Sequence, residues 1–330
     1  MIDIKDLKSN IENKIISAEK VIIVPHNNAD FDAIGSAIGL VLVAKKMKKQ
    51  SYIIVNDPMH IIDPGVKMII DESKKDYEII NCDKYLGITH PNDLFILTDV
   101  NKSYLVSVKD LLNNPDNIII IDHHDADKNT ISTDSLYIDT SCSSASEIVV
   151  NLLSACKIKI PSMVANYLYA GIYLDTAKLT KNCTAETMRV AAKLLESGAN
   201  INKVNELFKE DYLSDRKVQR LINNIEMINC MIALIAASDD EEYSREEIAK
   251  AADYALKYGA DAAFAIGKIE NGIISISGRS TEKINVGSIM GELGGGGNPY
   301  SGAAKIQEES IENVEKKLKR VLKPSYYIEN

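Results

Sequence analysis

The chain has 330 residues, of which 38 are basic and 47 are acidic, so its formal net charge is −9. This charge is poorly suited to binding long nucleic acid through its phosphates, and the length allows two domains with separate cores. No apolar run reaches the roughly 18 residues that a membrane span needs, and the first residues lack the character of a secretory signal. We therefore expect a cytoplasmic protein without a membrane partner.

Cysteine and histidine usage narrows the kinds of metal site that this chain can form. The five cysteines are scattered and form no Cys-x-x-Cys pair, which argues against a disulfide framework and against a zinc–thiolate site. There are only five histidines, and three of them, His26, His123 and His124, lie together with acidic residues directly after apolar segments.

The first strand and helix enclose a loop rich in possible metal ligands. The apolar segment 21–24 predicts a buried strand, and a helical spacing of apolar residues begins near Ala33. Between them lie His26, Asp30 and Asp32, at the carboxyl end of the strand, where open α/β sheets bind ligands. One imidazole and two carboxylates suit half of a divalent-metal site. Taken alone, the stretch fits equally well a turn in which Asp32 only caps the helix.

Three further apolar segments predict strands, at residues 51–55, 94–98 and 117–121. The second of these ends on Asp99, and the third on Asp122, His123 and His124. Because the carboxyl ends of parallel strands meet at one edge of a sheet, we expect these side chains to converge with the first loop in one crevice. Three such strand ends are difficult to explain by structural roles alone.

The next segments predict helices that bring further polar residues. A hydroxyl-rich stretch precedes a helix that reaches about Ala155, and its Ser144 fits two roles equally well. It either caps that helix or helps to present backbone N–H groups to an anion. A helical segment over 163–174 leads to Asp175, a candidate carboxylate ligand, and a helix from Thr184 to Gly198 follows.

A second domain is expected in the C-terminal third. Residues 201–229 look helical and polar, so we assign residues 1–215 to the first domain, a connector up to about 229, and residues 230–330 to the second domain. Its expected strands and helices lie at 231–236, 244–257, 262–266, 273–277 and 284–292. The last strand runs into Arg279, and four glycines precede Asn298. Such a glycine run either cradles a phosphate or forms a flexible turn.

These segments together resemble the DHH phosphoesterase superfamily. The matching motifs are His26-x-x-x-Asp30-x-Asp32, the strand-end Asp99, Asp122-His123-His124 and Gly171-x-x-x-Asp175-Thr176. The segment 278–280 and the glycine run resemble its DHH-associated C-terminal domain, and the chain is most similar to the NrnA-type nanoRNase/pAp-phosphatase group. The resemblance implies an α/β fold: an N-terminal, mostly parallel, doubly wound sheet, a smaller C-terminal α/β domain, and an active site in the cleft between them.

The resemblance also implies two Mn²⁺ ions per active site, with Mg²⁺ or Co²⁺ as substitutes. One ion would take Asp32, Asp99, His123 and Asp175, and the other His26, Asp30 and the shared Asp99. His124 would face the substrate phosphate, Asp122 would lie behind it, and water between the ions would attack phosphorus. The residue types agree with this expectation, because carboxylates mixed with imidazole and no thiolate favour Mn²⁺ or Mg²⁺. A shared carboxylate also suits two cations about 3.5–4 Å apart.

For substrate binding, the resemblance implies residues mainly of the second domain: Arg279, Ser280, Gly295, Gly296, Gly297 and Asn298, with Ser144 from the first. Arg279 would hold a phosphate bidentately. Asn298 stands where the family normally has a histidine, and asparagine donates a hydrogen bond without bringing a positive charge. We expect this difference to alter substrate preference and to leave metal binding intact.

The leading functional interpretation is hydrolysis of very short RNA oligonucleotides, of pAp, or of both, to mononucleotides, with no long nucleic acid as partner. An alternative is a phosphodiesterase for cyclic di-AMP or its linear product pApA. An alternative of another class is a nucleotide-binding regulator that turns over slowly because Asn298 replaces the usual histidine. The sequence is compatible with a homodimer and leaves the oligomeric state open.

Overall fold

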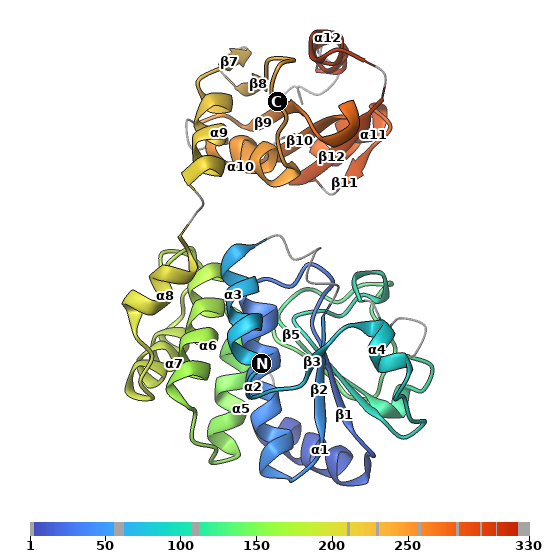
Figure 1. Ribbon diagram of the computed structural model, residues 1–330, viewed down its shortest axis with the longest axis vertical. Coiled ribbons are helices and arrows are strands. Elements are labelled where there is room, and N and C mark those ends of the chain that lie inside the picture. Colours follow the sequence, from blue (N-terminus) through green and yellow to red (C-terminus); the bar gives the residue numbers. More distant parts are fainter. Residues whose placement is uncertain are drawn as a thin grey trace. The chain divides into compact units, whose positions relative to one another are not determined.

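The structure is a computed structural model that describes residues 3–55, 63–106, 108, 112–209, 212–228, 231–256, 259–281, 284–297, 299–307 and 309–322. Asn298 lies outside these residues. The chain divides into two compact units, residues 1–209 and 210–330, and each is described by itself (Figure 1). The sequence-based boundary at residue 215 falls inside helix α9 (Tyr212–Ile222), whose Val218 and Leu221 belong to the core of the C-terminal unit.

The N-terminal unit is built on six parallel strands in the order β3-β2-β1-β4-β5-β6, which confirms the predicted sheet. The strands are β1 (Val21–Val24), β2 (Ser51–Ile54), β3 (Ile79–Ile80), β4 (Leu94–Thr98), β5 (Ile118–Asp122) and β6 (Leu136–Ile138). The sequence pattern did not predict β3 and β6, because two or three residues are too few for a periodicity to be recognised.

Successive side chains of the central strands enter two different cores, one on each face of the sheet. In β1, Ile23 joins the larger core, whereas Ile22 and Val24 join the smaller one. In Figure 1, α2, α5 and α6 lie on one side of this sheet and α4 on the other. The helices are α1 (Ile4–Ser17), α2 (Phe31–Lys46), α3 (Pro64–Ser73), α4 (Cys82–Leu86), α5 (Ala145–Ala155), α6 (Ser162–Asp175), α7 (Ala185–Glu196) and α8 (Ile201–Leu207).

Helix α2 is almost wholly buried, and small residues let its neighbours approach closely. A Cβ atom at Gly35 would lie 2.6 Å from the carbonyl oxygen of Tyr167 in α6, and one at Gly39 would lie 2.7 Å from Cγ1 of Val149 in α5. From the other side, a Cβ atom at Gly171 of α6 would lie 2.7 Å from Oδ1 of Asp32. Glycine at these positions therefore brings the first turn of α2 against both neighbouring helices.

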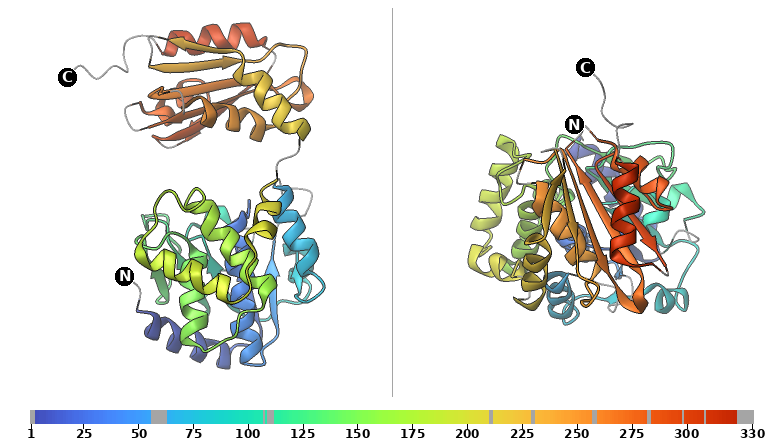
Figure 2. Two further views of the ribbon diagram at one scale, coloured as in Figure 1. Left: turned by 90° about the vertical axis from the view of Figure 1, so that its left-hand side faces the viewer. Right: turned by 90° about the horizontal axis from the view of Figure 1, so that it is seen from above.

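The C-terminal unit has a mixed six-stranded sheet, in the order β11-β12-β10-β9-β8-β7, in which only β8 and β9 pair in parallel. In Figure 2, α10 and α12 lie on opposite faces of this sheet. Its strands are β7 (Ile225–Ile228), β8 (Ile232–Ala236), β9 (Ala262–Lys268), β10 (Ile274–Ser280), β11 (Gly296–Gly297) and β12 (Ser301–Ile306). Its helices are α9, α10 (Arg245–Leu256), α11 (Val286–Glu292) and α12 (Ile311–Val321).

Two local expectations for this unit are wrong. Residues 225–228, expected to be helical, form the edge strand β7, which pairs with β8 in antiparallel orientation. The segment from Gly278 to Ser280 was expected after the end of a strand. It is instead part of β10, because this segment pairs with both β9 and β12.

Candidate active site

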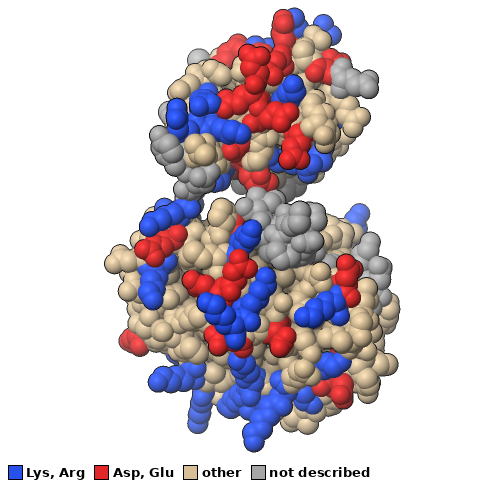
Figure 3. Space-filling view, in the orientation of Figure 1, with Lys and Arg blue, Asp and Glu red and all other residues tan. Residues whose placement is uncertain are grey.

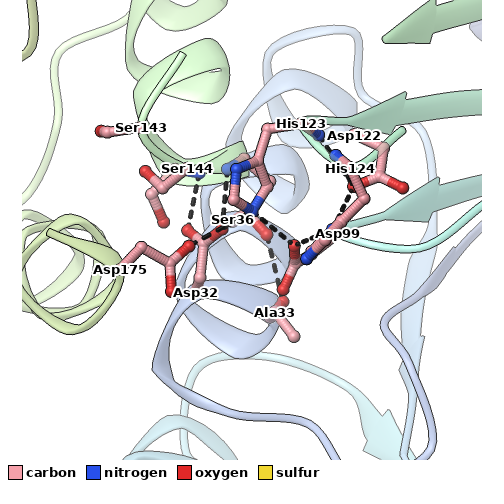
Figure 4. Close-up of polar contacts among 12 residues, drawn as sticks. Asp32, Ala33, Ser36, Asp99, Asp122, His123, His124, Ser143, Ser144 and Asp175 are labelled. Carbon is pink, nitrogen blue, oxygen red and sulfur yellow. Dashed lines mark hydrogen bonds and ion pairs between the residues drawn. The ribbon is translucent and has the colours of Figure 1, made fainter. Parts of the chain in front are cut away.

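The three predicted strand ends meet in one groove of the N-terminal unit, with a cavity volume of 1010 Å³. Its walls include His26 after β1, Asp99 after β4, His123 and His124 after β5, and Asp175 at the end of α6. Figure 4 shows Asp32, Asp99 and Asp175 directed towards the ring of His123. The parallel sheet thus gathers side chains that are far apart in the sequence.

One group of possible ligands surrounds His123. Its Nε2 atom lies 3.2 Å from Oδ2 of Asp175, 3.4 Å from Oδ1 of Asp99 and 3.9 Å from Oδ2 of Asp32. The ligand atoms of Asp32, His123 and Asp175 lie within 4.8 Å of one another, which is close enough for a single cation.

A second group surrounds His26. Its Nε2 atom lies 3.5 Å from Oδ2 of Asp99 and 3.8 Å from Oδ2 of Asp30, and these three residues also have ligand atoms within 4.8 Å of one another. Asp99 therefore belongs to both groups, with Oδ1 facing His123 and Oδ2 facing His26. All six candidate ligands thus come together in the groove. Asp99 and His123 also form a third such group with His124, so the groups share residues.

The electrostatics of the groove suit positive ions. Burial by itself would lower the pKa of His26, but the carboxylates of Asp30 and Asp99 raise it to about 10. Against burial, the carboxylates of Asp175 and Asp99 likewise raise the pKa of His123 to about 11. Burial raises the pKa of Asp32, and so do the charges of Asp99 and Asp175. Bound protons thus neutralise part of the negative charge of the crowded carboxylates.

Two buried atoms support a cation at this place. Among the described residues, Oδ1 of Asp99 and Nε2 of His123 are buried and have no hydrogen-bond partner. Buried polar atoms are normally satisfied, so two of them only 3.4 Å apart without a hydrogen-bond partner need an explanation. Carboxylate and imidazole donors of this kind fit Mn²⁺ or Mg²⁺.

The fully buried Asp32 is held by the N-terminus of α5. Its Oδ2 accepts a hydrogen bond from the backbone N–H of Ala145 at 2.7 Å, and its Oδ1 accepts one from that of Ser146 at 2.8 Å. The anion at this helix end is thus a side chain of the protein itself, stabilised by free N–H groups and by the helix dipole. Ser144 is the N-cap and accepts from the N–H of Glu147, while its neighbour Ser143 lines the groove.

The buried Asp122 organises the segment that follows β5. Its Oδ1 accepts hydrogen bonds from the backbone N–H groups of His123 and His124, and it lies 2.9 Å from Nδ1 of His124. Its Oδ2 accepts from Nδ2 of Asn101 at 2.6 Å. Because Nδ1 of His124 is the ring atom that contacts Asp122, its Nε2 remains available to the groove. Sequence reasoning missed Asn101, although its place two residues after the strand-end Asp99 was a usable signal.

Left-handed backbone occurs at one candidate ligand, Asp99, and shortly after another, Asp175. Asp99 itself has φ +57°, which aspartate tolerates better than most residues. After Asp175, the three residues Ala177, Lys178 and Leu179 all have φ between +46° and +65°. A run of non-glycine residues in this region is strained, and it ends α6 abruptly behind its last carboxylate.

The C-terminal unit has a pocket of its own, of 610 Å³. Its basic side chains are Arg245, Arg279 and Lys305, and the predicted residues Gly295, Gly296 and Gly297 line it too. Nε of Arg279 lies 2.9 Å from Oδ1 of Asp253 in α10. Ser280 does not line this pocket, because strand alternation turns it to the other face, where its hydroxyl donates to the carbonyl of Asp261. Asn298, also predicted to bind substrate, lies outside the described residues.

Comparison with known proteins identifies the family. Residues 20–172 match the DHH family, N-terminal domain, and residues 227–324 match the DHHA1 domain. The chain therefore belongs to the DHH family, whose members are phosphoesterases.

Three similar proteins illustrate the relationship. Cyclic-di-AMP phosphodiesterase GdpP of Geobacillus thermodenitrificans is 31% identical over 93% of this chain and 48% of its own length, so the chain spans about half of that relative. Bifunctional oligoribonuclease and PAP phosphatase NrnA of Mycoplasma pneumoniae is 25% identical over 66% of this chain and 65% of its own length. An exopolyphosphatase-related protein of Bacteroides fragilis shares the fold, with a TM-score of 0.75, 22% identity and 96% of both chains covered.

The resemblance to the NrnA-type group thus has a counterpart, but at lower identity and over less of the chain than the GdpP relative. Within the described residues, no helix is both long and apolar enough to cross a membrane.

Proposed function

We propose that the chain is a phosphoesterase that uses two divalent cations, with Mn²⁺ as the first choice. The observation that carries the proposal is the position of Asp99, whose two carboxylate oxygens face two different ligand groups. One cation would be held by Asp32, His123, Asp175 and Asp99, and the other by His26, Asp30 and Asp99. Bound cations would lower the pKa of water and stabilise charge on the phosphoryl oxygens.

The protein's own residues would do the rest. Asp122 fixes the ring of His124 through Nδ1, so that Nε2 donates to a phosphate oxygen of the substrate. Hydrogen bonding to Asp122 raises the pKa of His124 against the effect of burial, which favours the protonated, donating ring. Asn101 orients Asp122 from behind, and the N-terminus of α5 keeps Asp32 in place.

For the substrate, we propose a dinucleotide of the cyclic di-AMP or pApA type. Support comes from the GdpP relative, which is named a cyclic-di-AMP phosphodiesterase and matches 93% of this chain. The pocket of the C-terminal unit, lined by Arg245, Arg279 and Lys305, would accept a phosphate of such a ligand. Hydrolysis would break one phosphodiester bond for each water consumed and would open the ring to the linear product.

The test uses the purified full chain with MnCl₂ and a panel of cyclic di-AMP, pApA, pAp and a short labelled RNA. We expect cleavage of cyclic di-AMP or pApA that stops with EDTA and falls at least 100-fold in Asp122→Ala. The matched control is Asp134→Asn, an exposed carboxylate outside the groove, which should behave like wild type. Absence of cleavage with all four substrates, or an Asp122→Ala variant as active as wild type, would refute the proposal.

The second candidate is the oligoribonuclease and pAp-phosphatase activity expected from the sequence, which the NrnA relative supports. Faster cleavage of pAp and short RNA than of cyclic di-AMP in the same panel would favour it. The regulator alternative predicts tight nucleotide binding with slow turnover, and an Asn298→His variant that turns over faster. A fast wild-type enzyme excludes that alternative.

A further inference from the structure

The groove that holds the ligand groups is lined by an aromatic side chain that the proposed chemistry does not use. Tyr104 and Leu105 line the same groove as the ligand groups and are 63% and 41% exposed. Among the described residues, the large apolar side chains that are exposed include only two aromatic ones, Tyr104 and Tyr300. A tyrosine left in solvent at the edge of a polar groove lacks a structural reason, because its ring adds nothing to either core.

The short 3₁₀ helix Ser103–Leu105 carries Tyr104, and the residues around it fix the position of its backbone. Val100 before it and Val106 after it are each 2% exposed and anchor it in the smaller core of the N-terminal unit. The carbonyl oxygen of Leu105 accepts a hydrogen bond from the backbone N–H of Asn27 at 2.7 Å. Asn27 directly follows His26, so the platform of Tyr104 is tied to the loop that carries one of the ligand groups.

A second tether lies on the other side. Nζ of Lys102 pairs with Asp127 at 2.7 Å and donates to the carbonyl of Asp125, both in the segment that follows His124. The backbone that carries Tyr104 is therefore tied to the segments of both ligand groups before any substrate arrives. Within the described part of the chain, the ring of Tyr104 stacks on no other aromatic ring.

We propose that Tyr104 forms a nucleobase-stacking subsite of the groove. The inference rests on the proposed function, since it assigns the base of a nucleotide whose phosphate lies at the ligand groups. An aromatic face next to a site for cations and phosphate matches the two halves of a nucleotide, and stacking of a base on such a face tolerates different bases. Leu105 would extend the apolar surface, and Tyr104 would thus favour nucleotide phosphodiesters over phosphate esters without a base.

Binding is measured on the full chain with Ca²⁺ in place of Mn²⁺, so that the probe is not consumed. The probes are pApA with 2-aminopurine at one of its two positions and pApA made abasic at one of its two positions. Stacking on Tyr104 should quench the 2-aminopurine fluorescence at one position. Tyr104→Ala should weaken binding of the dinucleotide about tenfold or more, whereas Tyr104→Phe should bind like wild type. Leu86→Ala, half exposed on α4 outside the groove, is the matched control and should change nothing.

The abasic probes separate stacking from a general defect. When the probe lacks the base that would stack on Tyr104, wild type and Tyr104→Ala should bind that probe with equal affinity. Equal losses for the base-containing and abasic probes, or no quenching with wild type, would overturn the subsite. Quenching that depends on Tyr104 in a protein that cleaves none of the substrates would keep the subsite and refute the proposed activity. Cleavage of these substrates by wild type, together with an unchanged KM in Tyr104→Ala, would keep the proposed activity and refute the subsite.

Discussion

Asp99 belongs to two ligand groups, so its mutation should affect metal binding differently from mutation of a residue that belongs to only one group. Asp99→Ala removes a ligand from both groups, so we expect the number of tightly bound Mn²⁺ ions to fall from about two to one or none. Asp32→Ala removes a ligand from one group only and should leave the ion at His26. Equilibrium dialysis with metal analysis measures both. Two tightly bound ions in Asp99→Ala would contradict the shared role.

Proton competition at the two histidines gives a pH dependence with a definite sign. The neighbouring carboxylates raise the pKa of His26 to about 10 and of His123 to about 11, so both rings are protonated at neutral pH without metal. An imidazole must lose that proton to bind a cation. We therefore expect Mn²⁺ affinity to rise as the pH rises from 6 to 9, with protons released on binding. Calorimetry in buffers of different ionisation enthalpy counts them, and an affinity independent of pH would contradict the arrangement.

At the scale of elements, function depends on how helices begin and end against the sheet. Helix α5 directs its N-terminus at Asp32, and the capping residues Ser144 and Thr184 fix the starts of α5 and α7 beside the groove. The buried Glu147 joins these two helix starts, because its carboxylate accepts hydrogen bonds from Ser143 and from the hydroxyl of Thr187. Local hydrogen bonds of this kind set the wall of the groove.

The left-handed turn after α6 offers a test of backbone strain. Ala177 has φ +46°, where a Cβ atom is unfavourable and glycine is not. Ala177→Gly should therefore raise the free energy of unfolding by about 0.5–1 kcal/mol, because relief of strain exceeds the entropy that glycine loses on folding. Ala177→Val, with a branched Cβ, should lower it. Urea denaturation of both variants measures the difference, and a less stable glycine variant would show that the turn is not strained.

At the scale of the whole molecule, each unit has its own core and its own sheet. Figure 3 shows acidic side chains gathered on the visible face of the C-terminal unit, whereas many basic ones lie on that of the N-terminal unit. On this face the two units therefore differ in the sign of the side chains that they present.

Because the ligand groups all lie in the N-terminal unit, metal should stabilise that unit alone. Mn²⁺ at 100 times its dissociation constant should add about 2.7 kcal/mol to the stability of residues 1–209 for each ion bound. Differential scanning calorimetry should show two transitions, of which only one moves to higher temperature with MnCl₂. The Asp99→Ala variant links the moving transition to the ligand groups, because neither transition should move with MnCl₂ in that variant. Movement of both transitions in wild type would contradict the prediction.

The sequence alone predicted the parallel sheet and located the candidate ligands at its edge. Buried strands in such a sheet are continuous apolar runs, and residues directly after them reach one edge of the sheet, so Asp99 and His123 could be located from local pattern. The glycine run and Arg279 were singled out from local pattern and from the family resemblance. They line one pocket of the C-terminal unit, and their binding of substrate stays a prediction.

Only the tertiary structure decided which partners these residues have. The cap by Ser144 is a local hydrogen bond, but only the structure decided between the two roles that the sequence left open. The exposure of Tyr104 likewise follows from how its segment is placed in the fold. The hold of α5 on Asp32 and the support of Asp122 by Asn101 depend on contacts between segments distant in the sequence. Such contacts follow from how helices pack on a sheet, and residue type and spacing do not specify that packing. The short strands and the direction of Ser280 in β10 were missed because pairing with neighbouring strands, not local periodicity, fixes them.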